Sequence, residues 1–239
     1  MAYTTINKGS LHMNTVLWTG NSSTQAVTGV GFQPNWTWIK CRNDAQEPRL
    51  VDSVRGTTKY LDASLNIAET TSTNILTSFD TDGFTLGNNA ISNYSGNTMV
   101  GWNWKAGGTA SSNTDGSITS SVSANPTAGF SIVKYSGNST TGATVGHGLS
   151  TAPKMIIIKS LGVENWEVYH ESLGNTKGIY LNTTGASFTT SARWNNTSPT
   201  SSVWTMGSTT AVNGSGIDYV AYCFAEVKGF SKFGSYVGT

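Results

Sequence analysis

The sequence predicts an all-β protein built from two tandem antiparallel β-sandwich domains. An altered copy of residues 18–40 returns at residues 135–159, which indicates an internal duplication. Short runs of alternating apolar and β-branched residues are separated by Gly, Asn and Asp, as in strands joined by turns. No stretch has a clear 3.6-residue apolar period; residues 62–74 come nearest, but their threonines disfavour a helix.

Composition limits the possible partners. Charged residues make up 11% of the chain, against about 25% in an average protein, and the formal net charge is +1. We therefore expect no binding to nucleic acid, which requires a basic surface. The 8 Trp, 9 Tyr and 8 Phe residues supply enough apolar surface for packed cores. No apolar run is long enough to span a bilayer, and no signal-peptide pattern is present, so we expect neither membrane insertion nor export by that route.

The first repeat is predicted to span residues 14–108, after an N-terminal tether at residues 1–13. Its first strand signals are residues 16–18, 26–28 and 36–39. Trp36 and Trp38 share one face by the two-residue period, and their counterparts Met155 and Ile157 are apolar too. This agreement predicts that the face is buried. Residues 99–104 close the repeat and match residues 219–224, which assigns Trp102 and Trp104 to a core face as well.

Charged residues concentrate between Lys40 and Asp62. Such a group is usually a solvated face or a set of local ion pairs, each worth less than about 1 kcal/mol. A polar contact surface is the alternative interpretation.

Two hairpins follow from turn chemistry. Residues 55–61 and their counterparts 173–181 each place a glycine, Gly56 or Gly174, where a positive φ is needed. Residues 75–79 and 84–86 are joined by Asp-Thr-Asp-Gly, a strong hairpin signal. This string also resembles the start of a calcium loop, but the acidic ligands that must follow are missing, so it is interpreted as a turn.

The second repeat is predicted at residues 129–229. Residues 109–128, rich in Ser, Thr and Gly, are predicted to be the linker, although Ile118 and Val122 are compatible with a short edge strand. Residues 230–239 parallel the opening of a repeat, so they are either the opening strand of a truncated third repeat or a strand exchanged with a neighbour.

No common catalytic or metal-binding motif is present. Cys41 and Cys223 occupy non-corresponding places, which predicts two free thiols. The histidines are dispersed, so we expect no metal, no cofactor and no catalytic residue; His147, in a glycine-flanked turn, is interpreted as structural. Glycoside hydrolysis requires two carboxylates across a cleft, whereas Glu167 and Glu171 lie too far apart along one strand.

Sugar binding needs less: an exposed ring to stack on, with amides or hydroxyls beside it. Candidate exposed rings are those without an apolar counterpart in the other repeat, and each has the alternative interpretation of a ring that covers the edge of a core. The candidate glycan-binding residues are Trp194, Asn195, Trp166, His170 and Tyr94.

Several motifs are long enough to be compared with a family. They include residues 31–40 (GFQPNWTWIK), 78–87 (SFDTDGFTLG), 100–108 (VGWNWKAGG), 152–159 (APKMIIIK) and 165–174 (NWEVYHESLG). From about Asn14 onward the chain resembles the repeated domain of tail-fibre and other virion proteins of marine tailed phages. The resemblance implies a concanavalin-A-like or jelly-roll sandwich with a lectin-like or structural role, and it supplies no catalytic residues.

The resemblance implies a phage virion protein of the tail or surface, assembled in the host cytoplasm, and the lack of a catalytic motif leads us to expect that it is non-enzymatic. Its expected role is host attachment, as a tail-fibre or adsorption module that contacts host cell-surface polysaccharide. Other virion subunits are the expected partners, and the resemblance to tail fibres implies a homo-oligomer, in particular a trimer. A structural decoration or filament-forming subunit that assembles by strand addition is the alternative. A polysaccharide depolymerase is the third hypothesis.

Overall fold

The computed structural model describes residues 4–238 and shows an all-β chain made of antiparallel sheets with only single-turn helices, as the sequence predicted. The chain forms two compact units. The N-terminal unit is Lys8–Thr109, and the C-terminal unit is Ala110–Thr239 together with residues 4–7. The predicted tether is more ordered than expected, because Ile6 is buried and a 3₁₀ turn, η1, spans Gly9–Leu11; its residues 1–3 lie outside the described residues.

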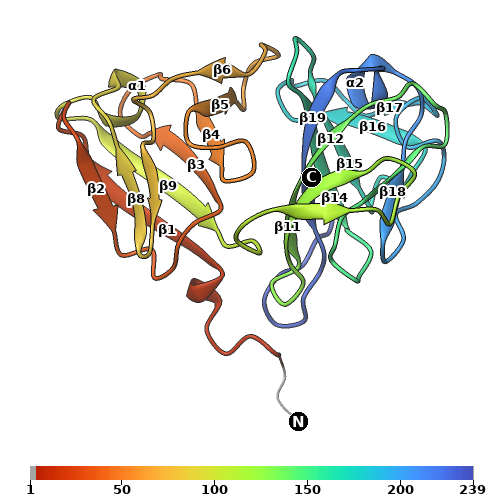
Figure 1. The fold of residues 1–239 in the computed structure, drawn as a ribbon, viewed down its shortest axis with the longest axis horizontal. Coiled ribbons are helices and arrows are strands. Elements are labelled where there is room, and N and C mark those ends of the chain that lie inside the picture. Colours follow the sequence, from red (N-terminus) through yellow and green to blue (C-terminus); the bar gives the residue numbers. More distant parts are fainter. Residues whose placement is uncertain (1–3, 239) are drawn as a thin grey trace. The chain divides into compact units, whose positions relative to one another are not determined.

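The N-terminal unit is a β-sandwich of a six-stranded and a three-stranded sheet (Figure 1). The order of the large sheet is β1 (Met13–Thr19), β9 (Thr98–Trp104), β3 (Trp36–Cys41), β4 (Arg49–Asp52), β5 (Lys59–Asp62) and β6 (Thr70–Thr71). The smaller sheet is formed by β2 (Gln25–Thr28), β8 (Gly83–Leu86) and β7 (Ser78–Asp80), and the one-turn helix α1 is Ala90–Asn93.

The C-terminal unit has an eight-stranded sheet and a two-stranded sheet (Figure 1). The order of the large sheet is β10 (Ser111–Asn113), β11 (Ser120–Asn125), β12 (Phe130–Ser136), β19 (Asp218–Phe224), β14 (Met155–Ser160), β15 (Trp166–His170), β16 (Lys177–Tyr180) and β17 (Phe188–Thr189). The pair is β13 (Thr144–Gly146) with β18 (Val203–Thr205), and the helix α2 is Thr210–Asn213.

The large sheets of the two units share one strand order. In the C-terminal sheet the spatial order is β12, β19, β14, β15, β16 and β17. Position by position, it corresponds to the order β1, β9, β3, β4, β5 and β6 of the N-terminal sheet. Registers match as well: Trp36 pairs with Trp104, and its sequence counterpart Met155 pairs with Phe224. The internal duplication itself stays a prediction, but the residues that the sequence comparison equated occupy the same place in the strand order and register.

The predicted core face of the tryptophans needs a correction. In the N-terminal unit the core between the sheets contains Ile39 and Cys41, which alternate along β3 with Trp36 and Trp38. Trp36 is buried, as predicted, and its ring lies 4.4 Å from that of Trp104. These rings nevertheless occupy the sheet face opposite the core. A two-residue period separates the faces of a strand but cannot say which one a second sheet covers.

The structure corrects the predicted linker at residues 109–128, because β10 and β11 of the large sheet lie within it. Strand β11 pairs with β12 through contacts such as Val122 opposite Val133, and Ile118 forms a bridge to Val145. Ile118 and Val122 belong to the core of the C-terminal unit. Val122 lies in a strand, but β10 pairs with the outer side of β11, so this strand is not the edge strand that the sequence allowed. Of residues 230–239, Ser231 forms a bridge with Val227, residues 232–238 have no regular secondary structure, and residue 239 lies outside the described residues.

Both predicted hairpins are confirmed. Strands β4 and β5 pair across a turn in which Gly56 has a φ of 94°, and β7 and β8 pair across a turn that ends at Gly83, with a φ of 137°. The Asp-Thr-Asp-Gly string is a turn, as expected. The carboxylate of Asp82 accepts the backbone N–H groups of Gly29 at 3.1 Å and Gly31 at 2.5 Å, so it fixes the loop after β2.

The charged segment contains both a solvated face and local ion pairs, as the sequence favoured, but some of these ion pairs are buried. Arg42 and Asp44 are exposed, but Arg49 and Asp62 form a buried ion pair between β4 and β5. Asp52, which is 0% exposed, accepts from the Nε of Arg55 at 2.6 Å. These buried ion pairs hold the β4–β5 hairpin together. They differ from surface ion pairs because their charged groups are shielded from solvent.

Cys41 and Cys223 are both free and buried, which confirms the prediction of two free thiols. Burial raises the pKa of the Cys223 thiol to about 12, so this thiol is protonated at neutral pH. Within residues 4–238, none of the helices has the length and apolar character needed to cross a membrane.

Candidate functional site

Tyr94 is the one ring among the glycan candidates that lies in solvent. It follows the helix α1 directly, and 54% of its surface is exposed. The helix begins at Asn89, whose side chain accepts the N–H of Ile91 at 2.9 Å. Such a cap fixes the start of a single turn that would not be stable by itself. The chain therefore leaves α1 in a defined direction and presents the Tyr94 ring at the surface.

Asn93, the residue before Tyr94, ties the surrounding loops together. Its side chain is fully buried, and its Nδ2 donates to the carbonyls of Ser23 at 2.5 Å and Gly87 at 2.9 Å. Its Oδ1 accepts the N–H of Asn21 at 3.0 Å. A buried amide that fills its hydrogen-bonding capacity with backbone groups rigidifies the loops that supply them.

A second set of contacts joins the loop after β1 to the loop after α1. Ser95 donates its N–H to the hydroxyl of Ser22 at 2.8 Å, and Gly96 donates to the carbonyl of Gly20 at 3.0 Å. A Cβ on Gly20 would lie 2.2 Å from the carbonyl oxygen of Tyr94, so only glycine allows this close approach. We call the exposed surface formed by these loops the Tyr94 platform: Asn21, Ser22, Ser23, Tyr94 and Ser95.

The chemistry of the Tyr94 platform is that of a neutral binding surface. The aromatic ring offers an apolar face, and the adjacent amide and hydroxyl groups offer donors and acceptors without charge. None of its five residues carries a carboxylate, an imidazole or an amine. This combination suits a polyhydroxylated ligand such as a sugar.

The C-terminal unit repeats the frame of the platform without its ring. Asn213 donates to the carbonyls of Thr140 and Gly207, both at 2.9 Å, and accepts the N–H of Asn138 at 2.9 Å. The residue that follows Asn213 is Gly214, where the N-terminal unit has Tyr94. The same frame with a glycine indicates that the ring is not needed to build it.

Trp194 and Trp166 are not exposed rings, and this corrects their selection as glycan-binding residues. They are 1% and 0% exposed. Trp194 turns into the core of the C-terminal unit, where its Nε1 donates to the carbonyl of Lys177 at 3.0 Å and its ring contacts that of Tyr169 edge-on at 5.6 Å. Because the residues next to Trp194 in the sequence are polar, the sequence did not indicate that its ring points into the core.

Asn195 and His170 support turns. Asn195 is half-buried in the left-handed region, with a φ of 49°. The Nδ1 atom of His170 accepts the N–H of Ser172 at 3.2 Å. The backbone carbonyl of His170 accepts the N–H of Leu173 at 3.0 Å, and this hydrogen bond closes the turn after β15. Tyr94 belongs to the other unit, so we treat it as a site separate from the other four residues.

The carboxylates considered for hydrolysis are held in different environments. Glu167 is 1% exposed and pairs with Arg193 at 2.8 Å, and burial raises its pKa. Glu171 is exposed and pairs with Lys154. One group inside the fold and one in solvent do not form the pair across a cleft that glycosidases use. Among the described residues, no group of three or more His, Cys, Asp or Glu side chains is placed to hold a metal ion.

Lys159 is a second titratable group that the sequence did not single out. It is fully buried, and burial lowers its pKa to about 8. Its Nζ donates to the carbonyls of Ser160 at 2.6 Å and Gly162 at 2.7 Å. Lys40, at the matching position of β3, donates to the carbonyl of Gln46 at 2.6 Å. Both lysines therefore hold the loop that leaves their strand, which explains Lys159 without a catalytic role.

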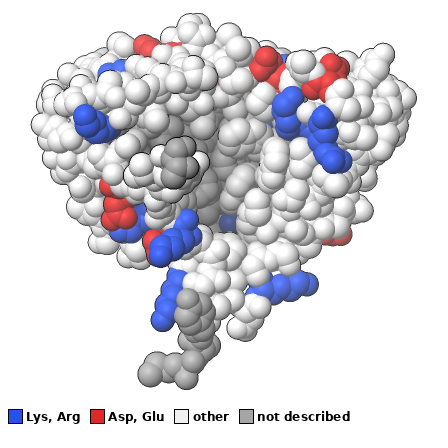
Figure 2. Space-filling model, turned by 180° about the vertical axis from the view of Figure 1, so that it is seen from behind, with Lys and Arg blue, Asp and Glu red and all other residues white. Residues whose placement is uncertain are grey.

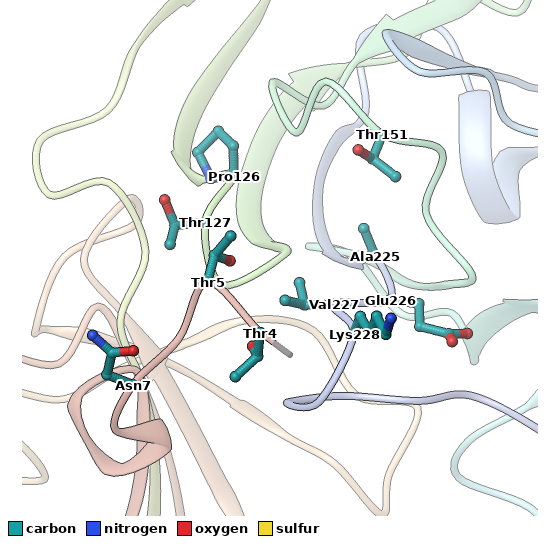
Figure 3. A pocket seen from close by; sticks show the side chains of 10 residues that line it. All are labelled: Thr4, Thr5, Asn7, Pro126, Thr127, Thr151, Ala225, Glu226, Val227 and Lys228. Carbon is teal, nitrogen blue, oxygen red and sulfur yellow. The ribbon is translucent and has the colours of Figure 1, made fainter. Parts of the chain in front are cut away.

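A groove of about 990 Å³ in the C-terminal unit is the other candidate binding feature. Figure 3 shows its lining side chains, which come from four separate stretches of the chain. No sequence pattern pointed to this groove, because its residues meet only in the folded unit. The lining residues are Thr4, Thr5, Asn7, Pro126, Thr127, Thr151, Ala225, Glu226, Val227 and Lys228.

The walls of this groove are fixed by backbone contacts. The N–H of Ala225 donates to the carbonyl of Gly129 at 2.7 Å, which joins the end of β19 to the turn before β12. Gly129 has a φ of 67°, and a Cβ there would lie 2.4 Å from the carbonyl oxygen of Ala225. The lining combines threonine hydroxyl groups and apolar side chains with one carboxylate and one amine, and it contains no aromatic ring.

His147 is structural, as the sequence indicated, and it is fully buried. Its Nδ1 accepts the N–H of Leu149 at 3.2 Å, and its Nε2 lies 3.2 Å from the carbonyl of Thr200. These partners require a neutral ring that is protonated at Nε2. Burial lowers the pKa of His147, because charging the ring inside the core is unfavourable.

We expect this histidine to make the C-terminal unit sensitive to acid. Because the folded pKa lies below the unfolded value of about 6.5, the unfolded chain binds the proton first. Stability should be complete above pH 6.5 and fall as the pH drops below it. Urea unfolding at pH 7.5 and 5.5 should show this loss in the wild type and a weaker dependence in His147→Gln. An equal dependence in both would contradict the assignment, and His170→Gln is the matched control.

Comparison with known proteins gives a family but no function. A family model described as a domain of unknown function (DUF7483) matches residues 8–239. Searches of curated proteins and of solved structures returned no match.

Proposed function

Since the chain belongs to the DUF7483 family, whose function is unknown, we propose a function from its own residues: it is a non-enzymatic phage virion protein that contacts host surface glycans. In this proposal it forms part of a tail fibre or another adsorption structure, as a homo-oligomer with other virion subunits. The resemblance of its motifs to tail-fibre repeats supports the location, and a trimer is expected on the same ground.

The observation that carries the proposal is the Tyr94 platform. A half-exposed ring on two rigid loops costs little ordering when a ligand binds, since the loops are already fixed. Sugars present apolar C–H faces and hydroxyl groups, which match the ring of Tyr94 and the side chains of Asn21 and Ser22. The frame with Gly214 shows that stability alone does not demand a tyrosine at this position.

The character of the surface supports the same ligand class. Figure 2 shows one face of the molecule, on which uncharged residues cover most of the surface and the Lys, Arg, Asp and Glu side chains are scattered. Such a surface contacts neutral polysaccharide without repulsion. The groove adds hydroxyl groups from threonines, and its one carboxylate, Glu226, lacks the second that hydrolysis needs.

The test is glycan binding by Tyr94 variants. Tyr94→Ala should weaken binding to host polysaccharide by at least about ten-fold per site, which corresponds to about 1.4 kcal/mol of lost ring contact. Tyr94→Phe keeps the ring and should retain most of the affinity. Binding is measured on a glycan array and then by titration of the best ligand.

Two controls make the result specific. A Thr151→Arg variant narrows the groove and should leave binding at the Tyr94 platform intact. The release of reducing ends from host polysaccharide should not occur. Equal binding by wild type and Tyr94→Ala would remove Tyr94 from the site, and release of reducing ends would favour the depolymerase hypothesis.

A further inference from the structure

The two large sheets differ at one edge. In the C-terminal unit, β12 pairs on its outer side with β11, and β10 follows. In the N-terminal unit, β1 occupies the position of β12 but ends the sheet. The same strand position is therefore covered by a further strand in one unit and is the terminal strand in the other.

The pairing of β11 with β12 shows how an added strand fits the corresponding edge of β1. Strand β11 runs antiparallel to β12, with Ser123 opposite Ile132 and Ser121 opposite Lys134. Phe130 pairs with the last residue of β19, just as Met13 pairs with the last residue of β9, which sets the correspondence of the two strands. Thr15 and Leu17 of β1 thus stand where Ile132 and Lys134 stand in β12.

The edge of β1 has few of the features that prevent strand addition. Its sequence, MNTVLWT, contains no charged residue and no proline, which are the usual protections of an edge strand. Leu17 is 61% exposed. The N–H of Thr15 is bonded to the side chain of Asn14 at 3.0 Å, and the carbonyl of Thr19 accepts from Gln25 at 3.1 Å. These side-chain amides can be exchanged for the backbone of an incoming strand.

A strand that fits this edge is present in the same polypeptide. Residues 232–238 have no regular secondary structure, and Tyr236 and Val237 are 93% and 94% exposed. Before them, the ring of Phe233 lies 6.2 Å from that of Phe224 and anchors the segment to its unit. Two adjacent apolar side chains in solvent are unfavourable in an isolated chain and would be covered on pairing.

We propose that residues 232–238 of one copy add as an antiparallel strand to the edge of β1 in a second copy. The donor and acceptor are different surfaces, so the contact is head-to-tail and generates a closed ring or a filament. Backbone hydrogen bonds supply the pairing, and the contact of Tyr236 or Val237 with Leu17 supplies apolar burial. This inference concerns assembly and does not depend on glycan binding at the Tyr94 platform.

The experiment compares three chains by sedimentation velocity over a range of concentrations. The full chain should form oligomers, and a chain that ends at Ser231, which keeps the bridge to Val227, should be monomeric. Thr15→Pro should also be monomeric, because it removes an N–H on the outer edge and leaves the ladder to β9 intact. Thr15→Ser is its matched control, and the melting temperature of each variant verifies folding.

A labelled peptide of residues 232–238 provides a second readout that does not require assembly. It should bind the shortened chain, as measured by fluorescence anisotropy, and binding should be lost with Thr15→Pro or Leu17→Lys. A monomeric full chain that also fails to bind the peptide would overturn the proposal. Oligomers of the shortened chain that Thr15→Pro disrupts would overturn it too, since they would mean that β1 pairs with β1 of another copy.

Discussion

Trp194→Ala should lower the free energy of unfolding of the C-terminal unit by about 3–5 kcal/mol, the range measured for large aromatic residues removed from cores. The ring is 1% exposed and contacts Tyr169 within the main cluster of that unit. Its loss leaves a cavity and removes the donor to the carbonyl of Lys177. Urea denaturation followed by circular dichroism measures the change.

The same substitution separates a core role from a binding role. Tyr94→Ala, at an exposed ring, should leave the unfolding midpoint unchanged within error while it weakens glycan binding. Trp194→Ala should lower the unfolding midpoint and, at temperatures where the variant is folded, leave glycan binding unchanged. A stable Trp194→Ala protein that loses glycan binding would contradict the buried position of this ring.

Asp52→Ala should destabilise the N-terminal unit by about 3–5 kcal/mol, as expected when one partner of a buried ion pair is removed. The carboxylate is 0% exposed and accepts the N–H of Val54 at 3.0 Å and that of Arg55 at 2.9 Å, besides the Arg55 side chain. Its removal leaves the guanidinium, itself 1% exposed, without this partner. Differential scanning calorimetry measures the loss.

A double-mutant cycle tests whether the loss comes from the pair. Asp52→Leu combined with Arg55→Met should be more stable than Asp52→Leu alone, because the Arg55 guanidinium then no longer remains buried without the Asp52 carboxylate. Asp44→Ala, at an exposed carboxylate of the same segment, should cause no measurable change. Additive effects of Asp52→Leu and Arg55→Met would show that the two side chains do not stabilise each other.

The hairpins were predictable because their signals are local. Asp-Gly before β8 and the glycines Gly56 and Gly174 dictate turns through their own backbone preferences. The pairing of Trp36 with Trp104 and of Met155 with Phe224 agrees with the internal comparison of the sequence. Such features depend on residues close in sequence or on a repeat that the sequence displays.

The candidate site was predictable only in part. Tyr94, between Asn93 and Ser95, was selected as an exposed ring and is one. Trp194 was selected on the same argument and lies in the core, since polar neighbours in sequence do not determine where an indole points. The groove had no signal at all, because its residues are brought together only by the fold.

The all-β class, the order of the strand signals, the turns and the free thiols can be inferred without the structure. Each of these follows from backbone preferences, from periodicity or from residue counts. Three features instead depend on the folded chain: the face of β3 that meets the second sheet, the place of residues 120–125 in the large sheet, and the inward direction of Arg49 and Asp62. The reason is that a strand pattern defines two faces, whereas distant segments of the chain decide which of them is covered.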